Sequence, residues 1–453
     1  MLLLAAMPLA ANAAPSAVST FHSIGLYWSP EGGSESNAAR VEFRKEGSGD
    51  AWRQGLDLWF DARDGEYRGS LVELEPGTRY EIRLALASGV RETLSGKTWS
   101  EKFPIKRTVA VQPGKRLVIR AEDSGDEKGY VLFTAPPAGN VIEGNAEDAS
   151  CVLVRQGAHH VIIRGLVLGN CKRYGILIER NPDRALDAQT HDVVIEDNEI
   201  TGWGGFDSRG SRLADDDGAI YCNYRRETDD AKRPDRIVIQ GNRIRDPRHG
   251  ANPWQSAAHG RLRPHGPLGV MFNRCGRNHV IRYNDIGSAN ANHYHDGIGG
   301  ADNFSTAGFP WADSDIYGNR VSEVYDDGIE AEGANRNVRI WGNHLRRVYV
   351  AIGNAATATG PLYVWRNVAT DMARMFQPEG NPRRDHRGPF IKAGSKQPQV
   401  NGGRAYYFHN TAPEAGAGIA RSGGPTYNFV ARNNRWPASR VNPEDGPFDL
   451  GRE

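Results

Sequence analysis

A short motif that ends in Asn recurs along most of the chain. In each copy β-branched and aromatic residues alternate along a short run, and the copies end at Asn198, Asn242, Asn284, Asn319, Asn343, Asn367 and Asn410. Asn433 ends an eighth copy, and residues 160–168 form an earlier copy without the Asn. The alternation predicts strands with one face in a core. Repeats of this kind predict a solenoid in which each coil packs on its neighbours.

The spacing of the motif sets the size of one coil. Asn319, Asn343 and Asn367 follow one another at intervals of 24 residues, and longer intervals elsewhere predict insertions. Since Asn tolerates the αL conformation and bonds neighbouring backbone, we expect a ladder of one Asn per coil. The repeat resembles the right-handed parallel β-helix family of polysaccharide-active proteins. The predicted fold is therefore all-β, with a right-handed parallel β-helix over residues 104–440 and a tail over 441–453.

Residues 17–103 follow a different pattern, in which short alternating strands are separated by turn residues. Trp28 and the run Leu74-Glu-Pro-Gly-Thr-Arg-Tyr80 resemble a fibronectin type III domain, where such a tyrosine closes the β-sandwich. We therefore expect a small sandwich before the solenoid. Residues 1–13 are largely apolar and end in Ala11-Asn12-Ala13, which predicts a signal peptide and a secreted or periplasmic protein.

The charge balance limits the expected partners, and the cysteine spacing limits the expected metal sites and disulfides. Lys and Arg (56) nearly balance Asp and Glu (55), so we expect no nucleic-acid partner and no membrane association. We also expect a monomer. The four cysteines lack the spacing of a zinc site. Cys151 and Cys171 lie about one coil apart and could pair in an oxidising compartment, or could be small buried residues of the stack.

A second repeat lies between the Asn copies and contains Asp217-Gly, Asp296-Gly-Ile and Asp327-Gly-Ile. It predicts another strand in each coil. Five predicted insertions mostly end just before this strand: 203–216, 246–264, 288–294, 303–312 and 371–387. Loops placed in this way would wall the face on which these strands lie, and binding residues favour such loops.

The second repeat also predicts a register. If Ile298, Ile329, Ile352 and Ile391 stack inward, then Gly299, Glu330, Gly353 and Lys392 form the adjacent outward column. Glu330 and Lys392 would then lie two coils apart, roughly 10 Å at the backbone, with a glycine between them. This arrangement predicts a groove about one sugar wide.

Carboxylates crowd the same face. Asp296, Asp326, Asp327 and Glu330 would repel one another unless they share a proton or a cation. Hard oxygen ligands favour Ca²⁺. A Ca²⁺ ion facing an isolated Lys392 suits β-elimination on a uronic acid: the ion would acidify the C5 proton, and the lysine, with its pKa lowered by burial and the cation, would remove it.

These residues resemble a known site. Asp296-Gly, Asp326-Asp327-Gly-Ile-Glu330 and Phe390-Ile-Lys392 are similar to the calcium site and catalytic lysine of family 9 polysaccharide lyases, which resemble pectate lyases in mechanism. The resemblance implies that Asp296, Asp326, Asp327 and Glu330 bind Ca²⁺ and that Lys392 is the base. Two positions depart from the pattern: Glu330 stands where that family has Asp, and Ile391 separates Phe390 from Lys392.

Other side chains in or beside the insertions are candidates for binding an acidic polysaccharide. Arginine suits bidentate recognition of carboxylates. The candidates are His265, His293, His295, Arg374, Arg387 and Asp217. Asp217-Gly is also an ordinary turn sequence, so Asp217 could simply turn its coil.

Three other functions fit the same pattern. A glycoside hydrolase could use Asp326 and Asp327 as acid and base, although the Gly-His-Gly and Asn-Thr-Asp motifs of polygalacturonase-like hydrolases are absent. A C5-epimerase would share proton abstraction at C5. A non-catalytic β-helix would bind glycan and tolerate replacement of Asp296, Asp327 and Lys392.

Overall fold

The computed structural model describes residues 13–136, 141–145, 147–180, 188–205, 217–254, 263–289, 292–303, 305–355, 359–373, 387–394, 401–422, 424–425, 428–441 and 448–450. The chain divides into two compact units, Met1–Lys102 and Phe103–Glu453. The predicted signal peptide falls outside the described residues except for Ala13, where the first strand begins. Within the described residues, no helix combines the length and apolar character that a membrane crossing needs.

The first unit contains two antiparallel sheets. One has the order β1 (Ala13–Ser19), β2 (Ile24–Ser29), β6 (Glu66–Leu71) and β5 (Trp59–Asp61), and the other β4 (Arg53–Gln54), β3 (Ala39–Lys45), β7 (Arg79–Leu86) and β8 (Arg91–Lys97).

Alternate residues of β3 and β7 are buried, and side chains from both sheets form one core that includes Trp28. The Glu75 backbone N–H donates to the Tyr80 hydroxyl at 2.9 Å, which closes the corner that the sequence predicts.

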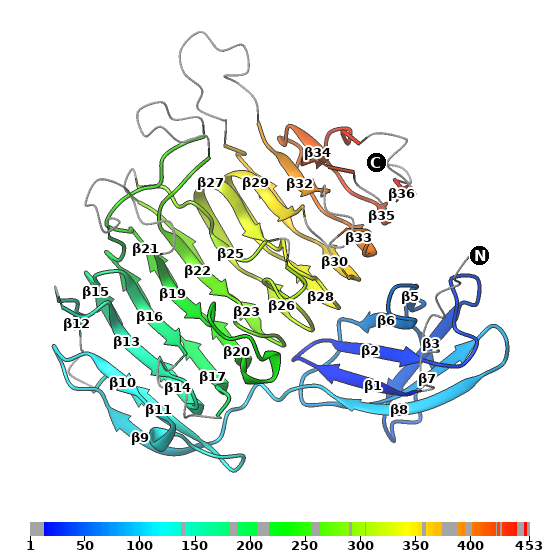
Figure 1. Ribbon diagram of the computed structural model, residues 1–453, viewed down its shortest axis with the longest axis horizontal. Helices are drawn as coiled ribbons and strands as arrows, with labels where there is room; N and C mark the ends of the chain where they lie inside the picture. Colours follow the sequence, from blue (N-terminus) through cyan, green and yellow to red (C-terminus); the bar gives the residue numbers. More distant parts are fainter. Residues whose placement is uncertain are drawn as a thin grey trace, which may run out of the picture. The chain divides into compact units, whose positions relative to one another are not determined.

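The second unit consists of coils whose parallel strands lie side by side (Figure 1). The first face is a single sheet that carries the strands of the Asn motif. It comprises β9 (Ile105–Ala110), β11 (Tyr130–Thr134), β14 (His159–Arg164), β17 (His191–Glu196), β20 (Asp235–Gln240), β23 (Val280–Arg282), β26 (Asp315–Tyr317), β28 (Val338–Trp341), β30 (Leu362–Trp365), β33 (Ala405–Phe408), β35 (Phe429–Arg432) and β36 (Phe448–Asp449).

Short strands that follow the Asn, or come before the first Asn copy in the early coils, form the second face. They are β12 (Val141–Glu143), β15 (Val167–Gly169), β18 (Glu199–Thr201), β21 (Arg243–Arg245), β24 (Asp285–Gly287) and β31 (Val368–Thr370).

The second repeat forms the third face. Its strands are β10 (Leu117–Ile119), β13 (Ser150–Arg155), β16 (Tyr174–Glu179), β19 (Gly218–Asn223), β22 (Leu268–Asn273), β25 (Ile298–Gly300), β32 (Pro389–Ala393) and β34 (Ala417–Arg421).

Two long strands, β27 (Arg320–Glu330) and β29 (His344–Asn354), pair with the second face at their start and with the third face at their end. They therefore join the two faces into one sheet. Two short 3₁₀ turns, Ala121–Asp123 and Asp230–Lys232, lie between strands. The predicted all-β fold, a right-handed parallel β-helix after a small sandwich, is confirmed.

A buried ladder of asparagines links the coils. In each step the Nδ2 group donates to the Oδ1 atom of the next Asn at 2.9–3.1 Å, through Asn198, Asn242, Asn284, Asn319, Asn343, Asn367, Asn410 and Asn434. Each of these side chains satisfies buried backbone groups as well, as in Asn343 Nδ2 to the Ile316 carbonyl at 3.0 Å.

The expected position of the last rung was wrong by one residue. Asn434, not Asn433, joins the ladder, and Asn433 has a φ of 55°. Every rung follows a residue with positive φ: Asp197, Gly241, Tyr283, Gly318, Gly342, Arg366, His409 and Asn433. The αL conformation thus belongs to the residue before the Asn, which leaves the Asn side chain free to point along the stack.

All four cysteines are paired. Cys151–Cys171 is one of the two arrangements that the sequence left open, and Cys222–Cys275 was not predicted. Their Cα atoms are 5.5 and 5.9 Å apart. Of the predicted tail, Phe448–Asp449 forms β36 and pairs with β35.

Candidate functional site

The third face has the register that the sequence predicts. Ile298 pairs with Ile329, Ile329 with Ile352, and Ile352 with Ile391, and all four side chains are fully buried. This stack directs the neighbouring residues outward, because successive strand residues point to opposite faces. Glu330, Gly353 and Lys392 consequently occupy equivalent positions on three successive coils.

Lys392 is not isolated, contrary to expectation. Its Nζ atom lies 2.6 Å from Asp327 Oδ2 and 2.8 Å from Glu332 Oε1, and its side chain is 20% exposed. Burial lowers the pKa of Lys392, but the negative charges of Asp327 and Glu332 outweigh this effect and hold the pKa well above its ordinary value. The expected lowering of this pKa is therefore wrong for the arrangement seen here.

Asp296, Asp326, Asp327, Glu330 and Glu332 form what we call the acidic site, and all five are buried. Ligand atoms of Asp327, Glu330 and Glu332 lie within 4.8 Å of one another, as do those of Asp296, Asp326 and His295. The two groups meet where the Asp327 backbone N–H donates to Asp296 Oδ1 at 2.9 Å.

Burial dominates the electrostatics of this site. It raises the pKa of Asp326 and of Glu330 well above their ordinary values, and neighbouring carboxylates add to the effect. Burial likewise raises the pKa of Asp327 to about 6, although Lys392 opposes the shift. Such a site must hold protons or a cation at neutral pH.

Unsatisfied oxygens favour a cation. Within the described residues, the buried Oδ1 atoms of Asp326 and Asp327 have no hydrogen-bond partner. Carboxylate oxygens are the ligands that Ca²⁺ prefers. Each of the two groups therefore fits a hard divalent cation, and the four predicted ligands are divided between them: Asp296 and Asp326 lie in one group, Asp327 and Glu330 in the other.

Glycines leave room for the charged groups. A Cβ atom on Gly353 would lie 2.2 Å from Asp327 Oδ2, and one on Gly299 would lie 2.9 Å from Glu330 Oε2. Neither glycine has a positive φ. A larger residue at either position would therefore displace the neighbouring carboxylate, although the backbone conformation would accept it.

Two contributors were missed from the sequence. Glu332 lies two residues after Glu330, and this strand spacing would have placed both on the outward face. Asn303 donates from Nδ2 to Glu330 Oε1 at 2.9 Å and to Glu332 Oε2 at 3.2 Å. Asn303 comes from an insertion, where no periodicity indicates its position.

The predicted substrate-binding residues separate in space. His295 Nε2 lies 3.6 Å from Asp296 Oδ2 and 3.8 Å from Asp326 Oδ2. The His265 ring stacks on the His295 ring, and their centroids are 6.1 Å apart. His293 instead stacks on Tyr325 at 4.3 Å, with Glu323 Oε2 3.4 Å away. His295 thus contacts two carboxylates of the acidic site, and His265 contacts His295.

The remaining candidates make other contacts. Asp217 accepts from Arg173 Nε at 2.7 Å and from the Gly205 N–H at 2.7 Å, which orders the bend before β19. Arg387 Nη1 donates to the Glu414 carbonyl at 3.0 Å. Arg374 lies outside the described residues.

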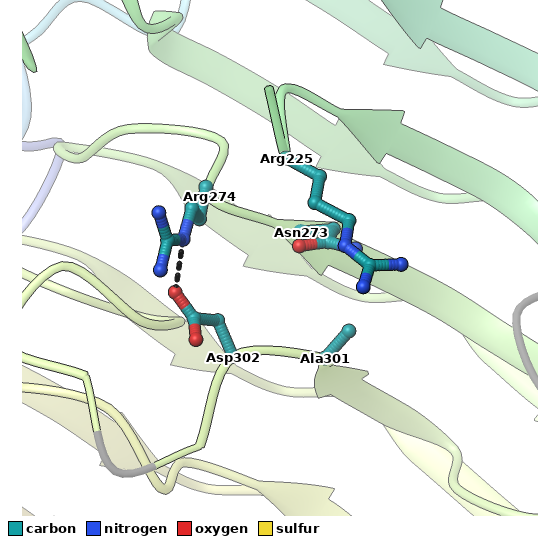
Figure 2. Close-up of a pocket in the computed structure, with 5 residues that line it drawn as sticks. All are labelled: Arg225, Asn273, Arg274, Ala301 and Asp302. Atoms are coloured by element: carbon teal, nitrogen blue, oxygen red, sulfur yellow. Dashed lines mark hydrogen bonds and ion pairs between the residues drawn. The ribbon is translucent and has the colours of Figure 1, made fainter. Parts of the chain in front are cut away.

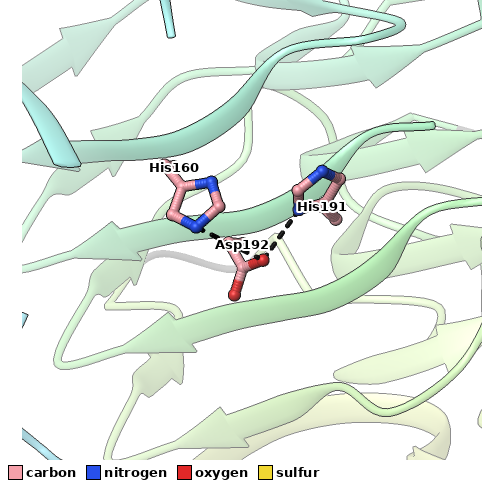
Figure 3. A group of neighbouring side chains, drawn as sticks. All are labelled: His160, His191 and Asp192. Atoms are coloured by element: carbon pink, nitrogen blue, oxygen red, sulfur yellow. Dashed lines mark hydrogen bonds and ion pairs between the residues drawn. The ribbon is translucent and has the colours of Figure 1, made fainter. Parts of the chain in front are cut away.

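A second group of metal-ligating side chains lies on the first face, where His160 and His191 flank Asp192 (Figure 3). His191 Nδ1 is 2.7 Å from Asp192 Oδ2, and Arg236 donates to both oxygens of Asp192, from Nε at 3.0 Å and from Nη2. Since protein groups already satisfy this carboxylate, the cluster is a structural ion pair.

Comparison with known proteins gives structural likenesses alone. No family model matches the chain, and no curated protein matches it. A family 28 exopolygalacturonase from Yersinia enterocolitica is 11% identical, with 96% of this chain and 98% of that chain covered and a TM-score of 0.33.

The Dettilon tailspike protein is 15% identical, with 74% and 60% covered and a TM-score of 0.43. A double mutant of the periplasmic alginate epimerase AlgG is 12% identical, with 71% and 73% covered and a TM-score of 0.35.

Proposed function

We propose that this protein is a polysaccharide lyase that cleaves a uronic-acid-containing glycan by β-elimination, with Lys392 as the base. The observation that carries the proposal is Lys392, which stands on an outward face against buried carboxylates that have open oxygens. An amine beside carboxylates that could hold a cation suits removal of a weakly acidic C5 proton.

Asp296, Asp326, Asp327 and Glu330 would hold Ca²⁺. When bound, the ion would neutralise the substrate carboxylate and acidify the proton at C5. The fifth carboxylate, Glu332, contacts Lys392 and Asn303 and would position the lysine.

Lys392 Nζ would take the proton from C5. The electron pair of that C–H bond forms the C4–C5 double bond while the C4–O bond breaks, and the leaving oxygen takes a proton from solvent. Asp327 and Glu332 stabilise the ammonium that results, since both contact Nζ. These same charges hold a proton on Lys392 at rest, so base action requires that they be compensated.

The other parts of the chain receive proposals of their own. We assign residues 17–103 to a fibronectin type III domain, supported by the two antiparallel sheets and the Tyr80 corner. We assign residues 1–13 to a signal peptide and the protein to the periplasm or the exterior. Two disulfides support export, because such bonds persist in oxidising compartments.

Glycoside hydrolysis is the second candidate. One observation favours it: burial raises the pKa of Asp326 well above its ordinary value, as a general acid requires. Hydrolysis would produce new reducing ends without an unsaturated sugar.

The test is the ultraviolet absorbance of unsaturated uronate on a panel of pectate, alginate, glycosaminoglycans and bacterial exopolysaccharides, with Ca²⁺ or EDTA. Wild type should produce a Ca²⁺-dependent rise on at least one polymer, and Lys392→Ala should abolish it. New reducing ends without this absorbance would favour hydrolysis. Neither signal on any polymer would count against both enzymes.

A further inference from the structure

A pocket with two arginines lies on the third face. Its lining residues are Arg225, Asn273, Arg274, Ala301 and Asp302, and its volume is about 450 Å³. Figure 2 shows Arg274 and Arg225 on opposite sides of Asn273. None of these residues belongs to the acidic site.

The register places this pocket beside the acidic site. Phe272 pairs with Gly300, and Ile298 pairs with Ile329, so Asn273, Ala301 and Glu332 occupy equivalent positions on three successive coils. Since coils stack about 4.8 Å apart, Asn273 lies roughly 10 Å before Glu332 along the face. Asp302 is also the neighbour of Asn303, which bonds Glu330 and Glu332.

The pocket has the chemistry of an oxyanion site. Arg274 donates from Nε to Asp302 Oδ2, and within the described residues its two Nη groups form no hydrogen bond. Arg225 is exposed and forms no ion pair with the described residues. Asn273 is 4% exposed and donates from Nδ2 to the Tyr221 hydroxyl at 3.3 Å, which fixes the floor.

Charge changes sign along the face. Two guanidinium groups against the single carboxylate of Asp302 leave the pocket positive, whereas the carboxylates of the acidic site, one to two coils away, would attract a substrate carboxylate only through a bound cation. Guanidinium groups bind carboxylates with paired hydrogen bonds. A polymer that carries a carboxylate on neighbouring sugars would present one anion to each site.

We propose that Arg225 and Arg274 bind the carboxylate of a uronate residue that neighbours the sugar held at the acidic site. The substrate class in this inference rests on the proposed function. The pocket would set the requirement for consecutive acidic sugars, because a chain with neutral sugars at that position would leave both arginines unpaired.

The experiment separates binding from cleavage. Uronate oligosaccharides are titrated by calorimetry into the full-length Lys392→Ala protein, with and without the added pair Arg225→Ala and Arg274→Ala. The matched control is Arg226→Ala, which removes an exposed arginine that does not line the pocket. If the double variant does not fold, Arg225→Ala alone replaces it, because Arg225 is exposed.

The double substitution of Arg225 and Arg274 by alanine should weaken binding of the uronate oligosaccharides by about tenfold. Arg226→Ala should change their affinity by less than about twofold. The same oligosaccharides with reduced carboxyl groups should bind all variants equally. Equal affinity of the double variant and the Arg226→Ala control for the uronate oligosaccharides would overturn the proposal. If the double variant weakens binding of acidic oligosaccharides while wild type produces no unsaturated uronate from them, the result would support the pocket and refute the lyase alone.

Discussion

Gly353→Ala tests whether the contact between Lys392 and Asp327 determines activity. The new Cβ would lie 2.2 Å from Asp327 Oδ2, the oxygen that contacts Lys392 Nζ at 2.6 Å. The carboxylate must withdraw by about 1 Å to restore van der Waals separation. A misplacement of about 1 Å in a catalytic constellation can cost on the order of 100-fold in rate.

Stability should change much less than activity. Gly353 lies in a strand without positive φ, where Ala is favoured over Gly by roughly 0.5–1 kcal/mol, and this gain offsets part of the strain. The assay is kcat/KM from unsaturated-uronate absorbance, with thermal unfolding in parallel.

Gly218→Ala is the control, since its Cβ would meet no atom closer than 3.2 Å in the same sheet. Gly353→Ala within threefold of the control in kcat/KM would refute the reasoning.

Three further predictions concern stability. Asn343→Ala should lower the free energy of unfolding by about 3 kcal/mol, because it leaves buried groups of Asn319 unsatisfied; urea unfolding measures this, and a loss under about 1 kcal/mol would contradict it. Reducing the disulfides, which close separations of 20 and 53 residues, should remove about 3 and about 4 kcal/mol, seen as a lower Tm with reductant; an unchanged Tm would count against both bonds. Burial raises the pKa of Asp61, but the Arg63 hydrogen bond and Arg68 outweigh it, so the pKa lies below 3.8. Its stabilisation is therefore present above that pH and lost as pH falls below it, and Asp61→Asn should flatten the fall of Tm between about pH 5 and pH 2; parallel curves would contradict this.

The fold was predictable because it is repeated. Each Asn copy carries the same alternation, and eight copies together specify a stack that no single copy could. The error at Asn433 shows the limit: two adjacent asparagines fit the motif equally well, and only the αL residue before the rung distinguishes them.

The positions of site residues were predictable where strand register determines which side chains align. Glu330, Gly353 and Lys392 align because the isoleucines beside them stack. The direction of the Lys392 pKa was not predictable, because it depends on Asp327 and Glu332 reaching Nζ across Gly353. Contacts that depend on how far a side chain extends produce no repeating pattern in a sequence.

Residues from insertions were the least predictable. Asn303 contacts two carboxylates of the acidic site, whereas His293 lies beside Glu323. Cys222 and Cys275 are 53 residues apart because an insertion separates two adjacent coils. Spacing alone could not bring these groups together.

Cleavage of a defined uronate oligosaccharide in oxygen-18 water tests the central claim most directly. β-Elimination breaks the C4–O bond without adding water, so the product masses should sum to that of the substrate and carry no label. Masses that sum to the substrate plus one labelled water would show hydrolysis and contradict the role of Lys392 as a base at C5.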